Sequence, residues 1–229
     1  MFTRLFTTAL FAGAIAGVLA AVLQLMFVQP VLLHAELYES GQLVHFGGEA
    51  NSAHPDLPGF DVTRDGLSII FTMIIYSAYA LILVAAMDFA AQQGAKINAR
   101  TGLLWGVAGF VIVHLAPAFS LPPEVPGVAA VDVFVRQIWW ACTVGASAVA
   151  LWLIAFGKSW MAWGPAVILL LAPHIIGAPE PDQFAGPVPT ELGALFAARA
   201  LGVGLAAWVM TGALAGYFWQ GDASQAEDG

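Results

Sequence analysis

Charged residues are scarce in this chain. Only 10% of its 229 residues are Asp, Glu, Lys or Arg, whereas an average soluble domain has about 25%. Hydrophobic residues make up 60% of the chain, and its mean hydropathy is +0.82. A soluble fold of this length would have too much surface to cover with so few charges. The composition therefore argues against a water-soluble domain and predicts an integral membrane protein.

Cysteine and enzyme motifs are also nearly absent. The one cysteine, Cys142, excludes a disulfide framework and any CxxC metal or redox motif. The chain has no HExxH, no GxSxG and no Rossmann glycine pattern. Gly157-Lys158-Ser159 matches the end of a phosphate-binding loop, but Trp152 stands where its first glycine would be. We therefore expect a protein that is not an enzyme, has no permanent cofactor and binds no nucleic acid.

Long apolar segments are what the chain does have. A membrane-spanning helix needs about 20 apolar residues, and six segments approach or exceed that length, at roughly 5–29, 67–90, 102–117, 134–156, 160–176 and 192–219. The third and fifth are short. The first could be mistaken for a signal peptide, but its apolar run exceeds the 7–15 residues of a signal core. It is read as an uncleaved span.

The predicted fold is an all-α integral membrane protein with about six transmembrane helices in three helical hairpins. A single membrane domain over 1–229 would contain hairpins at 1–92, 99–157 and 159–220 and a short acidic tail at 221–229. Pairs of glycines four residues apart would let helices approach closely: Gly13 and Gly17, Gly102 and Gly106, Gly212 and Gly216. Tryptophans near the predicted span ends are typical of helices that lie among membrane lipids.

The charges predict an orientation. One side has four basic residues and four acids, and its basic residues are Arg4, Lys96, Arg100 and Lys158. The other side has three arginines and eleven acids, so it carries the whole net charge of −8. Basic residues in short loops favour the cytoplasm. Both termini are therefore predicted to face the cytoplasm of a bacterial inner membrane, with the acidic loops outside.

A histidine, a Pro/Gly/acid loop and an arginine recur three times. The pairs are His34 with Arg64, His114 with Arg136, and His174 with Arg199. The loops after His114 and His174 are the most alike, which indicates a weak internal repeat, although two proline-rich loops can resemble each other by chance. Because proline cannot continue a helix interior, these loops are expected to be stiff and non-helical.

The returning helices are expected to begin at Thr63 and Thr190 as N-caps. Asp132 and Arg136 lie four residues apart on one face, as an ion pair requires. The arginines can therefore be interfacial anchors, or they can hold the acidic cluster near a pore mouth. Arg199 is the sharpest case, because it lies about two turns inside an apolar span, where an unpaired charge would be costly.

All five histidines lie in or beside the outward loops. Imidazole and carboxylate groups together suit divalent first-row metals, whereas each histidine singly could be a solvated polar residue. The predicted metal ligands are His34, Glu36, Glu39, His45, His54, His114, Glu124, His174 and Glu180. Glu49 belongs to the same acidic first loop.

Three segments resemble the family of proposed cobalt transporter subunits called CbtA. They are the opening span to Gln29-Pro30 with the AELYE stretch at 35–39, the loop at 114–127 with its LPPEVPG string, and the segment at 172–180. The resemblance implies a bacterial inner-membrane protein for cobalt uptake, tied to cobalamin synthesis. It also implies a small one-span partner, CbtB, with a histidine-rich segment.

The leading hypothesis is therefore a membrane component of a divalent transition-metal uptake system that captures cobalt at the outward His/Glu loops. An acidic surface would concentrate cations there. The alternative is a non-transporting accessory or assembly subunit of a larger membrane complex. A third hypothesis is a membrane metalloenzyme. The chain could also form a homo-oligomer.

Overall fold

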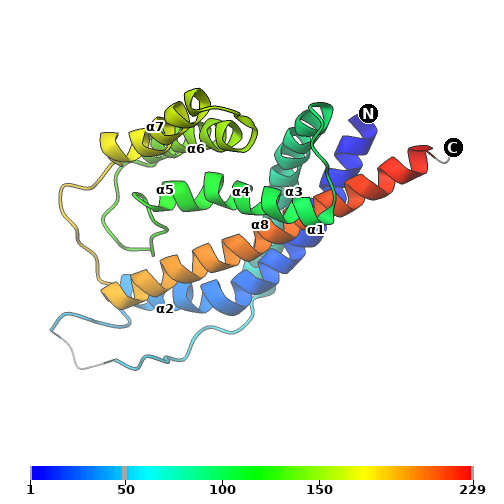
Figure 1. Ribbon diagram of the computed structural model, residues 1–229. Coiled ribbons are helices and arrows are strands. Elements are labelled where there is room, and N and C mark those ends of the chain that lie inside the picture. The colour runs from blue at the N-terminus through cyan, green and yellow to red at the C-terminus, as the bar shows by residue number, and fades with distance from the viewer. Residues whose placement is uncertain (1, 48–50, 228–229) are drawn as a thin grey trace. The chain divides into compact units, whose positions relative to one another are not determined.

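The computed structural model describes residues 2–47 and 51–227, with side chains over 3–47 and 51–221. Glu49 and the last two residues of the acidic tail lie outside the described residues. Helices make up the secondary structure of the described ranges, without strands (Figure 1). They are α1 (Phe2–Leu23), η1 (Gln24–Val28), α2 (Gln29–Glu39), α3 (Val62–Gln92), α4 (Ala99–Phe110), η2 (Val111–Leu115), α5 (Ala116–Ala118), α6 (Val133–Phe156), α7 (Trp160–Ile176) and α8 (Thr190–Glu227). The segments η1 and η2 are π-helical. The all-α prediction is confirmed.

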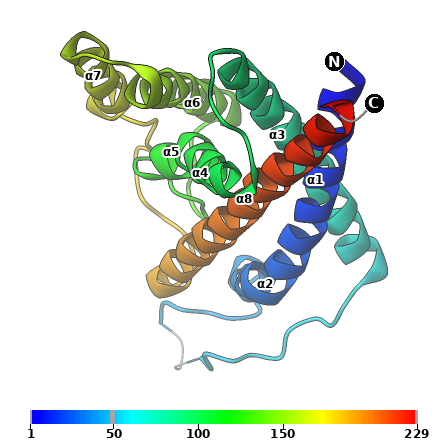
Figure 2. The same ribbon diagram turned by 45° about the vertical axis from the view of Figure 1, so that its right-hand side comes forward.

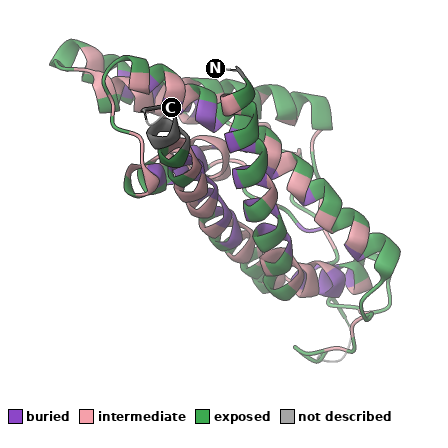
Figure 3. Cartoon of the chain, turned by 90° about the vertical axis from the view of Figure 1, so that its right-hand side faces the viewer, coloured by how far each residue is buried: buried purple, intermediate pink, exposed green. Residues whose placement is uncertain are grey.

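Five helical runs in the described chain are long and apolar enough to cross a membrane. They are Thr3–Glu39, Val62–Gln92, Ala99–Ala118, Val133–Phe156 and Thr190–Gly221. The sixth predicted span, Trp160–Ile176, is an apolar helix of 17 residues. Exposed residues run along the helices (Figure 3), and on α3 they include the apolar residues Ile70, Phe71 and Ile82. Such faces suit contact with lipid rather than water.

The chain forms two compact units. The arrangement as one membrane domain of three hairpins stays a prediction. The first unit comprises Met1–Val28, Gly59–Phe110 and Gly202–Gly229, and the second comprises Gln29–Pro58 and Val111–Leu201. The chain passes from one unit to the other within three helical runs. Two of these points, Val28/Gln29 and Phe110/Val111, border the π-helical segments.

The first unit is held together by close backbone contacts at glycine. A side chain on Gly13 or Gly17 of α1 would collide with the backbone of Ser77 or Met73 on α3. Between α4 and α8, Gly102 faces the backbone of Gly212 in the same way. The predicted small-residue pairs therefore mark real helix contacts, since only glycine lets two backbones come this close.

The start of α1 meets the end of α8 within the first unit. The Arg4 Nη2 donates a hydrogen bond to the carbonyl oxygen of Trp219 at 2.7 Å, and its guanidinium lies 4.4 Å from the centroid of the Trp219 ring. Figure 2 shows the first turns of α1 beside the last turns of α8. Both helix ends therefore belong to the same end of this unit.

The second unit brings together the three loops that contain or follow the histidines. Helices α6 and α7 pack against each other, joined by a short turn (Figure 1). The bases of the three loops share one hydrophobic cluster, which we call the loop core. It contains Ala35 and Tyr38 of α2, Val125 of the second loop and Val188 of the third, with Leu43, Val128, Leu192 and Phe196 packed against it. A hydrogen bond from the Ala129 N–H to the Ala185 carbonyl, at 2.7 Å, joins the second and third loops.

The helix starts differ from the sequence predictions. The N-cap of α3 is Asp61 rather than Thr63, because its carboxylate accepts the N–H of Arg64 at 2.7 Å. Asp132 caps α6 and accepts the N–H of Phe134 at 2.9 Å. The predicted pairing of Asp132 with Arg136 is wrong, because Arg136 pairs with Glu124 instead, at 2.7 Å. Helix α8 includes Thr190 as its first residue.

Candidate functional site

Proline places two of the histidines. Pro30 and Pro117 each lie just after a π-helical segment, and each has a histidine within about one turn: His34 on α2 and His114 in η2. Proline removes a backbone donor and crowds the preceding turn, so the helix widens there. Such π-helical segments often accompany functional sites, because they redirect side chains.

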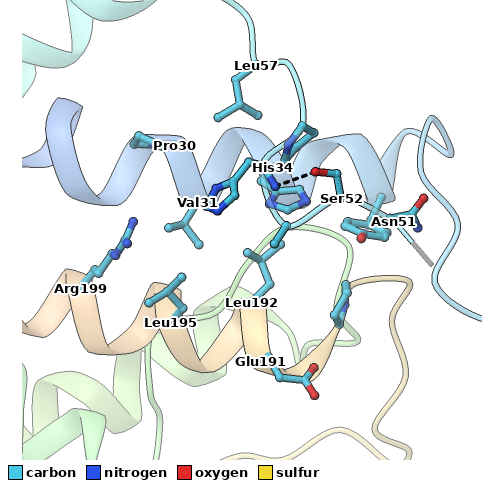
Figure 4. Close-up of a pocket in the computed structure, with 15 residues that line it drawn as sticks. Pro30, Val31, His34, Asn51, Ser52, Leu57, Glu191, Leu192, Leu195 and Arg199 are labelled. Carbon is cyan, nitrogen blue, oxygen red and sulfur yellow. Dashed lines mark hydrogen bonds between the residues drawn. The ribbon is translucent and has the colours of Figure 1, made fainter.

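His34 points into a cavity of about 450 Å³ in the second unit (Figure 4). One wall is α2, the facing wall is the first part of α8, and the loop around Ser52 covers the gap (Figure 4). Its lining comprises Pro30, Val31, His34, Tyr38, Asn51, Ser52, Ala53, His54, Pro55, Leu57, Pro189, Glu191, Leu192, Leu195 and Arg199. We call it the His34 cavity.

The His34 side chain is the most suitable metal ligand in this cavity. It is only 9% exposed, and its Nε2 atom is buried with no hydrogen-bond partner. Its ring stacks on that of Tyr38, with centroids 5.6 Å apart and planes at 29°. A buried, unpaired polar atom is costly. Stacking on Tyr38 therefore restrains the His34 ring, and its Nε2 atom lacks a partner. A metal cation bound at Nε2 would be such a partner.

The other predicted ligands of the first loop are spread over it. His54 is exposed and lines the same cavity. His45 is exposed outside the cavity lining, and its ring meets the edge of Tyr38 at 6.5 Å between centroids. Glu36 and Glu39 are exposed on α2. The aliphatic stem of Glu39 lies beside Gly127 of the second loop, so this residue contributes to loop packing.

His114 lines a second cavity of about 310 Å³. Pro117, Pro122, Arg136 and Trp140 are among the residues around it. His174 does not belong to that lining. Its Nδ1 lies 2.8 Å from the Ser120 Oγ, and its ring meets the edges of Phe119 and Trp139. The structure therefore gives these two histidines different surroundings.

The two remaining glutamates differ in their contacts. Glu124 Oε2 forms an ion pair with Arg136 Nη2 at 2.7 Å, so this arginine ties the second loop to the start of α6. Glu180 is exposed in the third loop. Among the described residues, no group of three or more His, Cys, Asp or Glu side chains is arranged to hold one metal ion. The predicted ligands are thus gathered on one unit but not into one closed site.

Two members of the His34 cavity were not predicted as site residues. Tyr38 lies four residues after His34, the spacing that puts two side chains on the same helix face, so the sequence carried that signal. Arg199 was singled out as a charge inside an apolar span, but nothing in the sequence placed it opposite α2 (Figure 4).

The fold and these cavities define a multi-pass, all-helical membrane protein with histidines gathered on one unit. The chain belongs to the CbtA family of probable cobalt transporter subunits, whose family model matches residues 2–220. No curated protein and no solved structure gives a significant match to the chain.

Proposed function

We propose that this chain is the membrane subunit of a cobalt uptake system and that it captures the metal in the His34 cavity. The observation that carries the proposal is the buried, unpartnered Nε2 of His34 facing a cavity that His54 also lines. Neutral imidazole nitrogen is a suitable ligand for divalent cobalt. The family match, to a probable cobalt transporter subunit, supports the same cargo.

The charge distribution supports entry from outside. The loops around the loop core belong to the side that carries the whole net charge of −8, and an acidic surface raises the local concentration of cations. In this proposal both termini face the cytoplasm of the bacterial inner membrane. The imported cobalt serves cobalamin synthesis, and a CbtB-like one-span subunit with a histidine-rich segment completes the system.

The test compares cobalt uptake by cells that express the wild type, His34→Gln or His45→Gln at equal protein level. His45 is the matched control, because it is an exposed histidine of the same loop outside the cavity. We expect His34→Gln to lower uptake by about tenfold or more, the scale of losses at disturbed metal sites. His45→Gln should leave uptake close to that of the wild type.

Unchanged uptake in His34→Gln would overturn this capture site. The combined variant His114→Ala with His174→Ala then separates the remaining readings. If that variant assembles but lowers uptake, metal capture occurs at those histidines instead. If it leaves uptake unchanged but disturbs assembly with partner proteins, the chain is an accessory subunit.

A further inference from the structure

Residues 51–58 of the first loop, which we call the cover segment, close one side of the His34 cavity (Figure 4). The buried Nε2 atom of His34 belongs to α2, whereas His54 belongs to the cover segment. The cavity therefore has an imidazole on each of two walls, and both walls are part of the second unit. A ligand that binds both rings would join the cover segment to the helix.

The cover segment is attached weakly to the rest of its unit. Among the described residues, only two hydrogen bonds involve it. The His54 N–H donates to the Ser52 Oγ at 3.1 Å, and the Asn51 Nδ2 donates to the Val44 carbonyl oxygen at 2.7 Å. Both bonds stay within the first loop, and neither reaches α2 or α8. Segments with few hydrogen bonds and exposed residues open at a low cost in free energy.

The same segment is stiff at its histidine. Pro55 follows His54 directly, and Pro58 ends the segment. Proline fixes its own φ angle and restricts the residue before it to extended geometry. The bond to Ser52 holds the His54 backbone as well, so little backbone freedom is lost when the ring meets a ligand. The cover segment is thus loosely attached but locally rigid, and it can move as one piece with a positioned imidazole.

The cavity has room for a metal ion that keeps part of its water. Its volume is about 450 Å³, and one water molecule takes about 30 Å³. Among the described side chains, no group of three or more His, Cys, Asp or Glu residues is arranged around one ion. Two imidazoles with water as the remaining ligands therefore suit this cavity. Such partial coordination also suits a cargo, which must bind and then leave.

We propose that the cargo metal is bound by His34 and His54 together, and that this fastens the cover segment over the cavity. The inference rests on the proposed function, and it names the second ligand and the movement that accompanies capture. Before binding, the segment opens readily and lets the metal reach the His34 nitrogen. After binding, the metal links the segment to α2, and Leu57 in the same lining helps to keep bulk water out.

Hydrogen–deuterium exchange of the purified full-length protein in detergent tests this proposal. Mass spectrometry would follow the amides of the cover segment without metal, with cobalt(II) chloride and with magnesium chloride. The variants are His34→Gln and His54→Gln. His45→Gln is the matched control, because it removes an exposed histidine of the same loop outside the cavity lining. Titration calorimetry gives the Kd for cobalt, and cobalt-edge X-ray absorption counts the imidazoles on the metal.

We expect cobalt well above its Kd to slow exchange in the cover segment by about tenfold or more in the wild type, because the metal stabilises the closed form by mass action. His45→Gln should behave in the same way, whereas His34→Gln and His54→Gln should lose the slowing. His54→Gln should also weaken cobalt binding by about tenfold or more and reduce the imidazoles on the metal from two to one. Magnesium should leave exchange unchanged, since it prefers oxygen ligands.

Equal slowing by cobalt in the wild type and in His54→Gln would overturn the proposal, and so would slowing that persists in His34→Gln or that magnesium reproduces. If His34→Gln nevertheless abolishes cobalt binding, the proposed function stays in place, because capture then uses His34 without the cover segment. Unchanged cobalt binding and uptake in His34→Gln would instead defeat the proposed function itself.

Discussion

The indole Nε1 of Trp140 donates a hydrogen bond to the backbone carbonyl of Val113 at 3.2 Å. Val113 lies four residues before Pro117, which has no N–H to give back to that carbonyl. The indole of α6 therefore supplies the donor that the proline removes. This contact fixes the π-helical segment η2 next to His114, and it explains how a proline is tolerated near the end of an apolar helix.

Replacing Trp140 by Phe should therefore destabilise the protein through the Val113 carbonyl. The expected cost is about 1 kcal/mol, since the carbonyl loses a hydrogen-bond donor. In a Pro117→Ala background the cost should be smaller, because the restored backbone N–H can take over. Unfolding in detergent, followed by circular dichroism in the four proteins of the cycle, measures the difference. Equal costs in both backgrounds would mean that the indole acts through packing alone.

Gly106→Ala should destabilise the contact between α4 and α8. A methyl group at Gly106 would collide with the backbone carbonyl of Trp208, and rigid backbone cannot move aside as a side chain can. Overpacking of this kind costs about 1–3 kcal/mol. The thermal unfolding midpoint in detergent should fall accordingly.

Gly145→Ala is the matched control for that change. A methyl group at Gly145 of α6 meets no atom within 4 Å, and alanine favours the helix over glycine by about 1 kcal/mol. Its unfolding midpoint should be unchanged or slightly higher. Equal midpoints for Gly106→Ala and Gly145→Ala would show that α4 and α8 separate readily at this point.

The contact between Arg4 and Trp219 predicts an even number of membrane crossings. Because the start of α1 and the end of α8 lie together, both must face the same side. The five long helical runs cannot achieve this without α7 as a sixth crossing. In a Cys142→Ser background, single cysteines at Thr3, Ser159 and Gln220 should share one labelling pattern with a membrane-impermeant reagent.

A cysteine at Asp182, in the loop after α7, should show the opposite pattern from those three. Shared labelling of positions 159 and 182 would mean that α7 does not cross. Opposite labelling of positions 3 and 220 would contradict the prediction directly, because the two helix ends could not then be in contact in the membrane.

Local composition predicted most of the helices, but it did not predict every side-chain contact that they make. The apolar runs located the helices, since a lipid environment requires about 20 apolar residues and a fully hydrogen-bonded backbone. The glycine pairs were also predicted correctly as helix contacts. Two small residues four positions apart lie on the same helix face, and this spacing can be recognised in the sequence. The pairing of Arg136 was wrong. Asp132 caps the helix instead, and Arg136 pairs with Glu124 of the preceding loop.

The sequence by itself determined that this is an all-helical membrane chain with its histidines and most of its acids in or beside three interhelical loops. These properties follow from residue type and local spacing. The tertiary structure decided which histidine lies in a cavity with an unpartnered nitrogen, and that Arg199 faces it across two helices. It also decided that the three loops share one hydrophobic core. Such contacts join residues far apart in the chain, and no local pattern in one sequence specifies them.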